Sequence, residues 1–247
     1  MRGAAFVAEQ ARAAVAGRGR FTLAVSGGHT PRAMFARLAG EDVPWEKVTI
    51  YQVDERVAPD GAADRNLTHL RASLPPEADI RAMPVGAPDL EVAAQDYARS
   101  LPERFDLVHL GLGPDGHTAS LVLGDAVLVV ADRDVAVTGT YMGRRRMTLT
   151  YPTLDRARQV LWLVTGEDKV DAFRRLRAGD HSIPAGRVAA ASALVIADFT
   201  GEFDDPEALA TRLSATPGVI EHGLFPAAMV SEVVLGRGNQ VERITPP

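Results

Sequence analysis

Residues 105–121 read FDLVHLGLGPDGHTASL, in which a short apolar run leads into a loop rich in glycine. A run that is apolar at nearly every position is typical of a parallel strand buried on both faces of a sheet. Glycines and a proline constrain the loop that follows, and this loop carries Asp115 and, two residues later, His117. Histidine changes its charge near neutral pH, so His117 is a candidate general base.

Similar apolar runs recur along the chain and alternate with helix-like segments. Residues 1–20 have the pattern of an amphipathic helix. The other expected helices are 31–39, 64–73, 90–100 and 167–177, and the expected strands are 21–25, 48–53, 105–112 and 160–166. This rhythm predicts an α/β fold with an open, mostly parallel sheet and helices on both of its faces.

The composition changes near residue 188, beyond the last of these helices. Residues 188–199 fit either a strand or a helix end, and residues 230–236 read as a final strand. Residues 204–215 have the aspartates and the early proline that begin a helix. We therefore expect a larger domain over residues 1–190 and a small α/β appendage over residues 191–247.

The chain of 247 residues has a net charge of −5 and no cysteine. The negative charge argues against a protein that binds nucleic acids or anionic membranes. Without cysteine, disulfides and thiolate chemistry are excluded. No apolar run approaches the roughly 20 residues that a membrane span needs, and the N-terminal residues lack the apolar core of a signal peptide. We expect a soluble, cytoplasmic protein without a nucleic-acid or membrane partner.

Polar residues gather where each expected strand ends, at the edge where open α/β sheets bind ligands. SGGHT (26–30) precedes a helix and presents backbone N–H groups to an anion. Asp54 and Arg56 share one side of an extended chain, and an arginine there can bind phosphate bidentately. Lys169 follows the fourth strand, and one arginine of the basic run RRRMTLT (144–150) can turn inward.

Each of these signals also has a purely structural explanation. Glycines suit any tight strand-to-helix turn, and charged residues after a strand suit a solvated loop. For the histidines other than His117 we expect a structural role, as helix caps or core residues. The histidines have no metal-ligand spacing, and the loops match neither GxxxxGK[ST] nor, after the first strand, GxGxxG. The sequence therefore predicts no metal and no dinucleotide cofactor.

Taken together, these motifs resemble the 6-phosphogluconolactonase family, whose superfamily includes ribose-5-phosphate isomerase and glucosamine-6-phosphate deaminase. The matching segments lie in the family's order within residues 6–188 and are FTLAVSGGHTP, VTIYQVDERVAPDGAADRNLTHLR, FDLVHLGLGPDGHTASL, RMTLTYPTL, VLWLVTGEDK and IPAGRV. The resemblance implies a Rossmann-like fold that hydrolyses 6-phospho-D-glucono-1,5-lactone to 6-phosphogluconate in the oxidative pentose phosphate pathway, without metal or cofactor.

The resemblance also implies roles for individual residues. His117 would activate water, and Asp54 and Arg56 would orient the substrate and the histidine. The implied substrate-binding residues are Ser26, Gly27, Gly28, Thr30, Asn66, Asp115, Arg146 and Lys169. Three departures from the family pattern stand out: Arg65 replaces the usual serine before Asn66, VLG (122–124) replaces FPG, and the N-terminal strand and helix are shortened.

The C-terminal segment, 191–247, instead resembles the end of ribose-5-phosphate isomerases, above all in PGVIEHGLF (217–225). The DGADE and KGGGG motifs of that isomerase are missing. Two alternatives to a lactonase remain: a sugar-phosphate isomerase or deaminase on the same scaffold, and a non-catalytic sugar-phosphate sensor. Thr118-Ala119-Ser120 argues against a deaminase, and the combination of Asp54, Arg56 and His117 argues against a sensor. We expect a homodimer in which residues 191–247 supply much of the contact.

Overall fold

A computed structural model of the chain describes residues 2–198, 205–216, 219, 233–237 and 240–244. The chain divides into two compact units, Met1–Phe199 and Thr200–Pro247. Within the described ranges, no helix combines the length and the apolar character that crossing a membrane requires.

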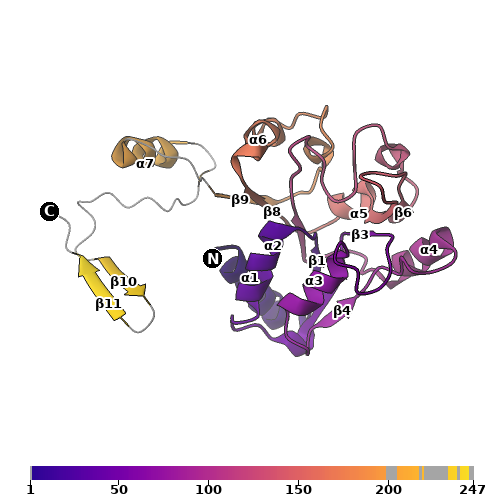
Figure 1. The fold of residues 1–247 in the computed structure, drawn as a ribbon, viewed down its shortest axis with the longest axis horizontal. Helices are drawn as coiled ribbons and strands as arrows, with labels where there is room; N and C mark the ends of the chain where they lie inside the picture. Colours follow the sequence, from indigo (N-terminus) through magenta and orange to yellow (C-terminus); the bar gives the residue numbers. More distant parts are fainter. Residues whose placement is uncertain (1, 199–204, 217–218, 220–232, 238–239, 245–247) are drawn as a thin grey trace. The chain divides into compact units, whose positions relative to one another are not determined.

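The first unit is built on a six-stranded parallel sheet (Figure 1). Across the sheet the strands are β4 (Asp79–Arg81), β2 (Val48–Gln52), β1 (Phe21–Val25), β5 (Leu107–Leu110), β8 (Val160–Thr165) and β9 (Ala193–Asp198). Every neighbouring pair is parallel. All residues of the central strands β1 and β5 are buried, which explains their nearly continuous apolar sequences. The predicted α/β fold with an open parallel sheet is confirmed.

Helices cover both faces of this sheet, and their apolar side chains form two hydrophobic clusters. The helices of one cluster are α1 (Arg2–Arg18), α2 (His29–Leu38) and α3 (Asn66–Ser73). Those of the other are α4 (Leu90–Ser100), α5 (Tyr151–Asp155) and α6 (Val170–Arg177). Short 3₁₀ helices are η1 (Trp45–Lys47), η2 (Ala126–Val129), η3 (Glu167–Lys169) and η4 (Ala185–Arg187). The five helices expected in residues 1–177 all have counterparts, with η3 forming the first turn of the segment 167–177.

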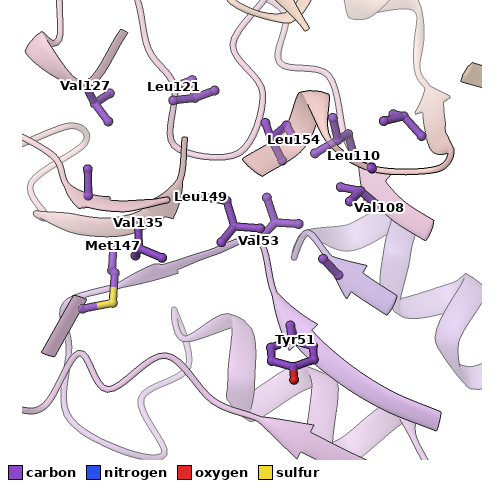
Figure 2. Packing of buried hydrophobic residues seen from close by; sticks show 14 of the residues in the cluster. Tyr51, Val53, Val108, Leu110, Leu121, Val127, Val135, Met147, Leu149 and Leu154 are labelled. Carbon is purple, nitrogen blue, oxygen red and sulfur yellow. The ribbon is translucent and has the colours of Figure 1, made fainter. Parts of the chain in front are cut away.

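A second, antiparallel sheet was not predicted. Its strands, in order, are β3 (Asp54–Arg56), β7 (Arg146–Leu149) and β6 (Val135–Val137). Apolar side chains of this sheet, including Val135, Met147 and Leu149, join the same cluster as Val108 and Leu110 of the main sheet (Figure 2). Every residue of β7 is buried, so residues 146–149 of the basic run 144–150 form a buried strand.

Residues 193–198 resolve the ambiguous segment at the predicted domain boundary. They form β9, which pairs with β8 in parallel from Ala193 to Asp198. The strand therefore belongs to the main sheet, and the division between the two units lies beyond the expected boundary at residue 190. Backbone pairing with β8 explains this difference, since the alanines of the segment do not by themselves favour a strand.

The second unit contains α7 (Pro206–Ser214) and a hairpin of β10 (Val233–Arg237) and β11 (Gln240–Ile244). The helix begins as its sequence predicts, because the Asp205 carboxylate accepts a hydrogen bond of 2.9 Å from the Ala208 N–H. Apart from Val219, the segment 217–225 lies outside the described residues.

Candidate functional site

His117 lies in the loop after β5, where its ring contacts the neighbouring Asp115. The Nδ1 atom is 2.6 Å from Asp115 Oδ1, and the His117 backbone N–H donates to the same oxygen at 3.2 Å. A Cβ on Gly113 would lie 2.1 Å from Nδ1, so only glycine leaves room for the ring there. An ionised Asp115 makes Nδ1 the protonated nitrogen and leaves the lone pair on Nε2.

The charge state of Asp115 supports this arrangement. Burial by itself raises the pKa of the Asp115 carboxyl group. The hydrogen bonds and the charge of His117 outweigh burial, so the pKa lies below its ordinary value. Asp115 is therefore ionised at neutral pH and can hold the His117 ring in one tautomer.

Asp54 and Arg56 lie on the same face of β3, as their spacing predicts. Asp54 is buried, and its Oδ2 atom accepts a hydrogen bond of 2.6 Å from the Ser120 hydroxyl. Ser120 follows His117 by three residues in the same loop. Its Oδ1 atom accepts a longer bond of 3.3 Å from the Asn66 amide. Arg56 Nη1 donates to the Asn66 side-chain oxygen as well. These bonds connect β3 to the loop after β5 and to the start of α3.

Arg56 and Arg146 stand directly opposite each other in the antiparallel ladder of β3 and β7. Directly opposed side chains of an antiparallel pair lie on the same face, and like charges in that position destabilise the sheet. Arg146 is only 6% exposed, and its Nε atom has no hydrogen-bond partner among the described residues. Burial lowers the pKa of Arg146, an effect that Asp54 opposes and Arg56 reinforces. Two close cations, one of them incompletely paired, favour an anionic ligand.

The position of β7 decides which arginine of the basic run turns inward, because the strand begins at Arg146. Arg146 is buried, whereas Arg144 and Arg145 are exposed. Arg144 Nε lies 3.0 Å from Asp64 Oδ2, so it ties the β6–β7 connection to the loop before α3.

Glu55 points to the opposite face of β3 and organises the start of α3. It is fully buried, and its carboxylate accepts hydrogen bonds of 2.8 Å from the backbone N–H groups of both Asn66 and Leu67. The Gln52 amide donates to it at 2.9 Å, and Arg65 Nε lies 3.1 Å away. A carboxylate at a helix N-terminus is stabilised by the unpaired N–H groups and by the helix dipole.

Sequence reasoning missed this role of Glu55, which sets the position of Asn66. One signal was available in Arg65, the residue that departs from the family's serine. Arg65 is 4% exposed, and a buried arginine requires an anionic partner. Ser120 and Tyr141, which contact Asp54 and Asp115 respectively, were also absent from the predicted set.

The glycine-rich segment 26–30 leads into α2, and its Gly27 packs against Asn66, the first residue of α3. A Cβ on Gly27 would lie 1.9 Å from Asn66 Oδ1, so this approach requires glycine. Ser26 is 5% exposed, and its hydroxyl has no partner among the residues that the structure describes. The cavity beside this loop measures about 10 Å³ and is lined by Ser26, Gly27, Gly28, Asn66 and neighbouring side chains. A cavity of this volume has room for about one water molecule and cannot enclose a sugar phosphate.

Thr30 and Lys169 extend the cluster towards β8. The hydroxyl oxygens of Thr30 and Thr165 are 2.6 Å apart, which joins the start of α2 to the end of β8. Lys169 ends η3 and precedes α6, and its ammonium group lies 3.0 Å from Asp168 Oδ2. Its proposed contact with a ligand therefore stays a prediction.

The structure thus joins the predicted residues, apart from Lys169, through direct contacts or shared loops at one edge of the sheet. Among the described residues, no three histidine, aspartate or glutamate side chains are grouped as metal ligands would be. The arrangement supplies a hydrogen-bonded imidazole, buried carboxylates, two opposed guanidinium groups and the N-terminus of a helix. Such a set can bind an anionic group and transfer a proton.

Comparison with known proteins identifies the family. Residues 1–196 match the sequence profile of the family described as "Glucosamine-6-phosphate isomerases/6-phosphogluconolactonase". Residues 165–240 match that of "Ribose 5-phosphate isomerase A (phosphoriboisomerase A)". A 6-phosphogluconolactonase of Synechocystis sp. is 40% identical over 175 residues, which cover 65% of this chain and 72% of the relative. That of Rattus norvegicus is 34% identical over 207 residues, covering 75% and 80%.

Solved structures agree with these sequence matches. The crystal structure of a 6-phosphogluconolactonase from Shewanella baltica superimposes with a TM-score of 0.71 at 29% identity, covering 78% of this chain and 90% of that one. The 6-phosphogluconolactonase from Thermotoga maritima gives a TM-score of 0.69 at 26% identity, covering 79% and 95%. The profile match extends over most of the chain, and the parallel sheet is shared. The chain therefore belongs to the glucosamine-6-phosphate isomerase and 6-phosphogluconolactonase family.

Proposed function

We propose that the protein is a 6-phosphogluconolactonase, which hydrolyses 6-phospho-D-glucono-1,5-lactone to 6-phosphogluconate in the oxidative pentose phosphate pathway. The relatives of highest identity reported above carry this activity in their names. The observation that carries the proposal for this chain is the His117–Asp115 pair, which shares the edge of the sheet with the opposed Arg56 and Arg146. The predicted cytoplasmic location is consistent with a pathway of free sugar phosphates.

The phosphate group of the substrate is proposed to bind Arg146 and the loop 26–30. Arg146 brings a buried positive charge with an unpaired Nε donor among the described residues. The N-terminus of α2 adds backbone N–H groups and the positive end of a helix dipole. Lys169 is proposed to add a second cation from the end of β8. Asn66, held between Asp54 and Arg56, then lines the sugar-binding part of the site.

His117 is proposed to act as the general base. Its Nε2 atom takes a proton from water as the water oxygen attacks the lactone carbonyl carbon, and a tetrahedral oxyanion forms. Arg56 orients the lactone and stabilises the negative charge of the oxyanion. The carbon–oxygen bond of the ring then breaks, and the protonated His117 returns its proton to the departing ring oxygen. The product carries a hydroxyl group and a carboxylic acid, which ionises in solvent.

Asp54 is proposed to hold this arrangement together. Its carboxylate accepts hydrogen bonds from Ser120, in the loop that carries His117, and from Asn66 of α3. It therefore fixes the two sides of the site relative to each other. It also lies on the face of β3 that carries Arg56 and lowers the electrostatic cost of the two arginines.

A lactonase assay tests the proposal. Purified protein and freshly prepared 6-phosphogluconolactone should release acid much faster than buffer alone, and EDTA should leave the rate unchanged. His117→Ala should reduce the rate by roughly 10²- to 10⁴-fold, the usual contribution of a positioned proton-transfer group. The affinity for 6-phosphogluconate should change little in that variant.

Two outcomes would contradict the proposal. Hydrolysis at the buffer rate, together with tight binding of 6-phosphogluconate, would identify a non-catalytic sensor. Conversion of ribose 5-phosphate without lactone hydrolysis would identify an isomerase on the same scaffold.

A further inference from the structure

Residues 138–145 connect β6 and β7 and are called the arm here. Tyr141 lies at the end of this arm, where backbone hydrogen bonds hold it. Tyr141 and Arg144 exchange two backbone hydrogen bonds, of 2.9 Å and 3.3 Å. The two residues between them, Met142 and Gly143, have φ values of 50° and 77°. Two successive positive φ values define the tight turn that matches the twist of a β-hairpin. The ion pair of Arg144 with Asp64 fixes the end of the arm against the loop before α3.

The Tyr141 side chain contacts three residues of the proposed site. Its hydroxyl donates to Asp115 Oδ2 at 3.4 Å, and its ring meets the His117 ring edge-on with centroids 5.7 Å apart. The Arg146 guanidinium lies over the same ring, 5.0 Å from its centroid. Tyr141 is thus the residue through which the arm contacts both the proposed base and a proposed phosphate ligand.

The two oxygens of Asp115 have different partners. Oδ1 accepts from the ring and the backbone of His117, and Oδ2 accepts from Tyr141. Burial and the nearby Asp115 charge both raise the pKa of Tyr141, so the phenol remains a hydrogen-bond donor. With both oxygens engaged, the Asp115 carboxylate cannot rotate freely away from His117 Nδ1. The hydroxyl therefore acts on the imidazole through Asp115.

The ring of Tyr141 contributes in a second way. A cation over an aromatic face is stabilised by the ring quadrupole. This contact partly compensates Arg146 for facing Arg56 and for its burial, and it restricts where the guanidinium can point.

We propose that Tyr141 is a positioning residue of the lactonase site, whose hydroxyl aligns Asp115 with His117 and whose ring aligns Arg146 with the phosphate of the substrate. This inference rests on the proposed function and adds to it a residue that no family motif quoted above contains. The hydroxyl and the ring of Tyr141 should therefore have separable effects. Loss of the hydroxyl should affect proton transfer, and loss of the ring should affect phosphate binding.

Two substitutions separate these parts. Tyr141→Phe keeps both ring contacts and removes the bond to Asp115, so kcat should fall roughly 2- to 10-fold, as expected for one hydrogen bond, while KM stays unchanged. Tyr141→Leu also removes the ring, so KM should rise roughly 2- to 10-fold in addition, as expected for one cation–π contact. Met142→Ala is the matched control, because Met142 lies in the same turn with 80% of its surface exposed. This variant should behave as the wild type.

A measurement independent of turnover tests the hydroxyl directly. Nitrogen NMR of the histidine rings distinguishes the two neutral tautomers, and the His117→Asn variant assigns the signals of His117. In the wild type the proton should reside on Nδ1, and in Tyr141→Phe the proportion of this tautomer should fall. The Met142→Ala spectrum should match the wild type.

The outcomes keep the two proposals apart. If the wild type does not hydrolyse the lactone, the proposed function fails, whatever the spectra show. If the wild type is active and Tyr141→Phe and Tyr141→Leu retain its kcat, KM and histidine spectrum, the role of Tyr141 is overturned. Equal losses in Tyr141→Phe and Met142→Ala would also overturn it, since the effect would then belong to the turn.

Discussion

Single residues of the proposed site carry energetic costs that binding can offset. Arg56 and Arg146 face each other across two strands, and Arg146 is buried with an unpaired Nε donor among the described residues. In the unliganded protein this arrangement brings two positive charges together and removes one of them from water. A phosphate bound to Arg146 and a negatively charged substrate oxygen bound to Arg56 would offset this electrostatic cost. If the proposed function is correct, such a site binds phosphate at the expense of stability.

Replacement of Arg146 by methionine should therefore separate binding from stability. Arg146→Met should weaken binding of 6-phosphogluconate by roughly 10-fold or more, because a charged hydrogen bond contributes about 1.5–3 kcal/mol. The unliganded variant should unfold at the same or a higher denaturant concentration than the wild type. Calorimetric titration and urea unfolding measure the two quantities. A variant that binds normally and unfolds earlier would show that Arg146 serves the fold and not the ligand.

Lys169 provides a contrasting test at the same scale. Its ammonium pairs with the adjacent Asp168, so a solvated helix start explains it as well as ligand binding does. If Lys169 binds the phosphate, Lys169→Ala should lower the affinity for 6-phosphogluconate and leave the weak affinity for gluconate unchanged. Equal calorimetric affinities in the variant and the wild type would favour the structural explanation.

At the scale of elements, the start of α3 depends on a carboxylate from a different strand. Glu55 takes the place that a side-chain N-cap would fill, and Arg65 at the N-cap position makes no such bond. The same pair, Glu55 and Arg65, is almost completely buried, with side-chain exposures of 0% and 5%. Such a pair holds α3 and its first residue, Asn66, against the edge of the sheet.

Glu55→Gln should consequently be strongly destabilising. The substitution leaves the buried Arg65 without an anionic partner, and breaking one half of a buried ion pair costs about 3–5 kcal/mol. Urea unfolding should show a markedly lower midpoint. Asp132→Asn is the matched control, because this carboxylate pairs with Arg133 on the surface and is 73% exposed, so the midpoint should not move. Coincident midpoints for Glu55→Gln and the wild type would refute this account of α3.

At the scale of the whole molecule, a buried histidine should make stability depend on pH. His109 lies in the central strand β5, fully buried, with neither ring nitrogen bonded to any described residue. Its ring instead meets Phe35 edge-on, with centroids 5.8 Å apart. Burial lowers the pKa of His109 from 6.5 to about 4, since the core solvates the charged form poorly.

The sign of the effect follows from the protons bound in each state. Between pH 6.5 and about 4 the unfolded chain protonates His109 and the folded protein does not, so stability falls as the pH falls. The loss amounts to about 3 kcal/mol once the pH is below 4. His109→Leu should remove this part of the pH dependence, and His181→Asn, at an exposed position, should not. Urea unfolding between pH 7.5 and 4 measures the free energy of unfolding at each pH. If this free energy fell equally steeply with pH in the wild type and in His109→Leu, burial of His109 would not explain the pH dependence.

The second unit leads to a prediction about assembly. On α7, Leu209 and Leu213 are half-buried and four residues apart, so they share a face. One helix and one hairpin bury too little surface to offset their conformational entropy. We predict a homodimer in which the C-terminal segment supplies much of the contact, since a dimer is the commonest symmetric assembly.

Light scattering on the full chain tests this prediction directly. A truncated chain should end at Phe199, because an earlier end would remove β9 from the main sheet. The full chain should be a dimer, and the truncated chain should be a monomer that retains lactone hydrolysis. A monomeric, active full-length protein would rule the dimer out.

The sequence by itself determined the fold class and most of the proposed site. Parallel strands buried on both faces need nearly continuous apolar runs, and loops at their carboxyl ends follow directly in sequence. For this reason β1, β2, β5 and β8 could be predicted from 21–25, 48–53, 105–112 and 160–166. The motifs placed His117, Asp115 and Arg56 at strand ends because each follows its strand within a few residues.

The tertiary structure alone decided the elements whose partners are distant in the chain. β3, β6 and β7 are each three or four residues long, and the antiparallel pairing of β3 with β7 joins residues 54–56 to 146–148, so no local period reveals them. That pairing turns Arg146 inward, places it opposite Arg56, and brings Tyr141 to Asp115. Burial, likewise, converts Glu55 from one charge in a loop into the cap of α3. Local sequence sets strands and turns through backbone preferences, whereas charge pairing and burial depend on residues that only the folded chain brings together.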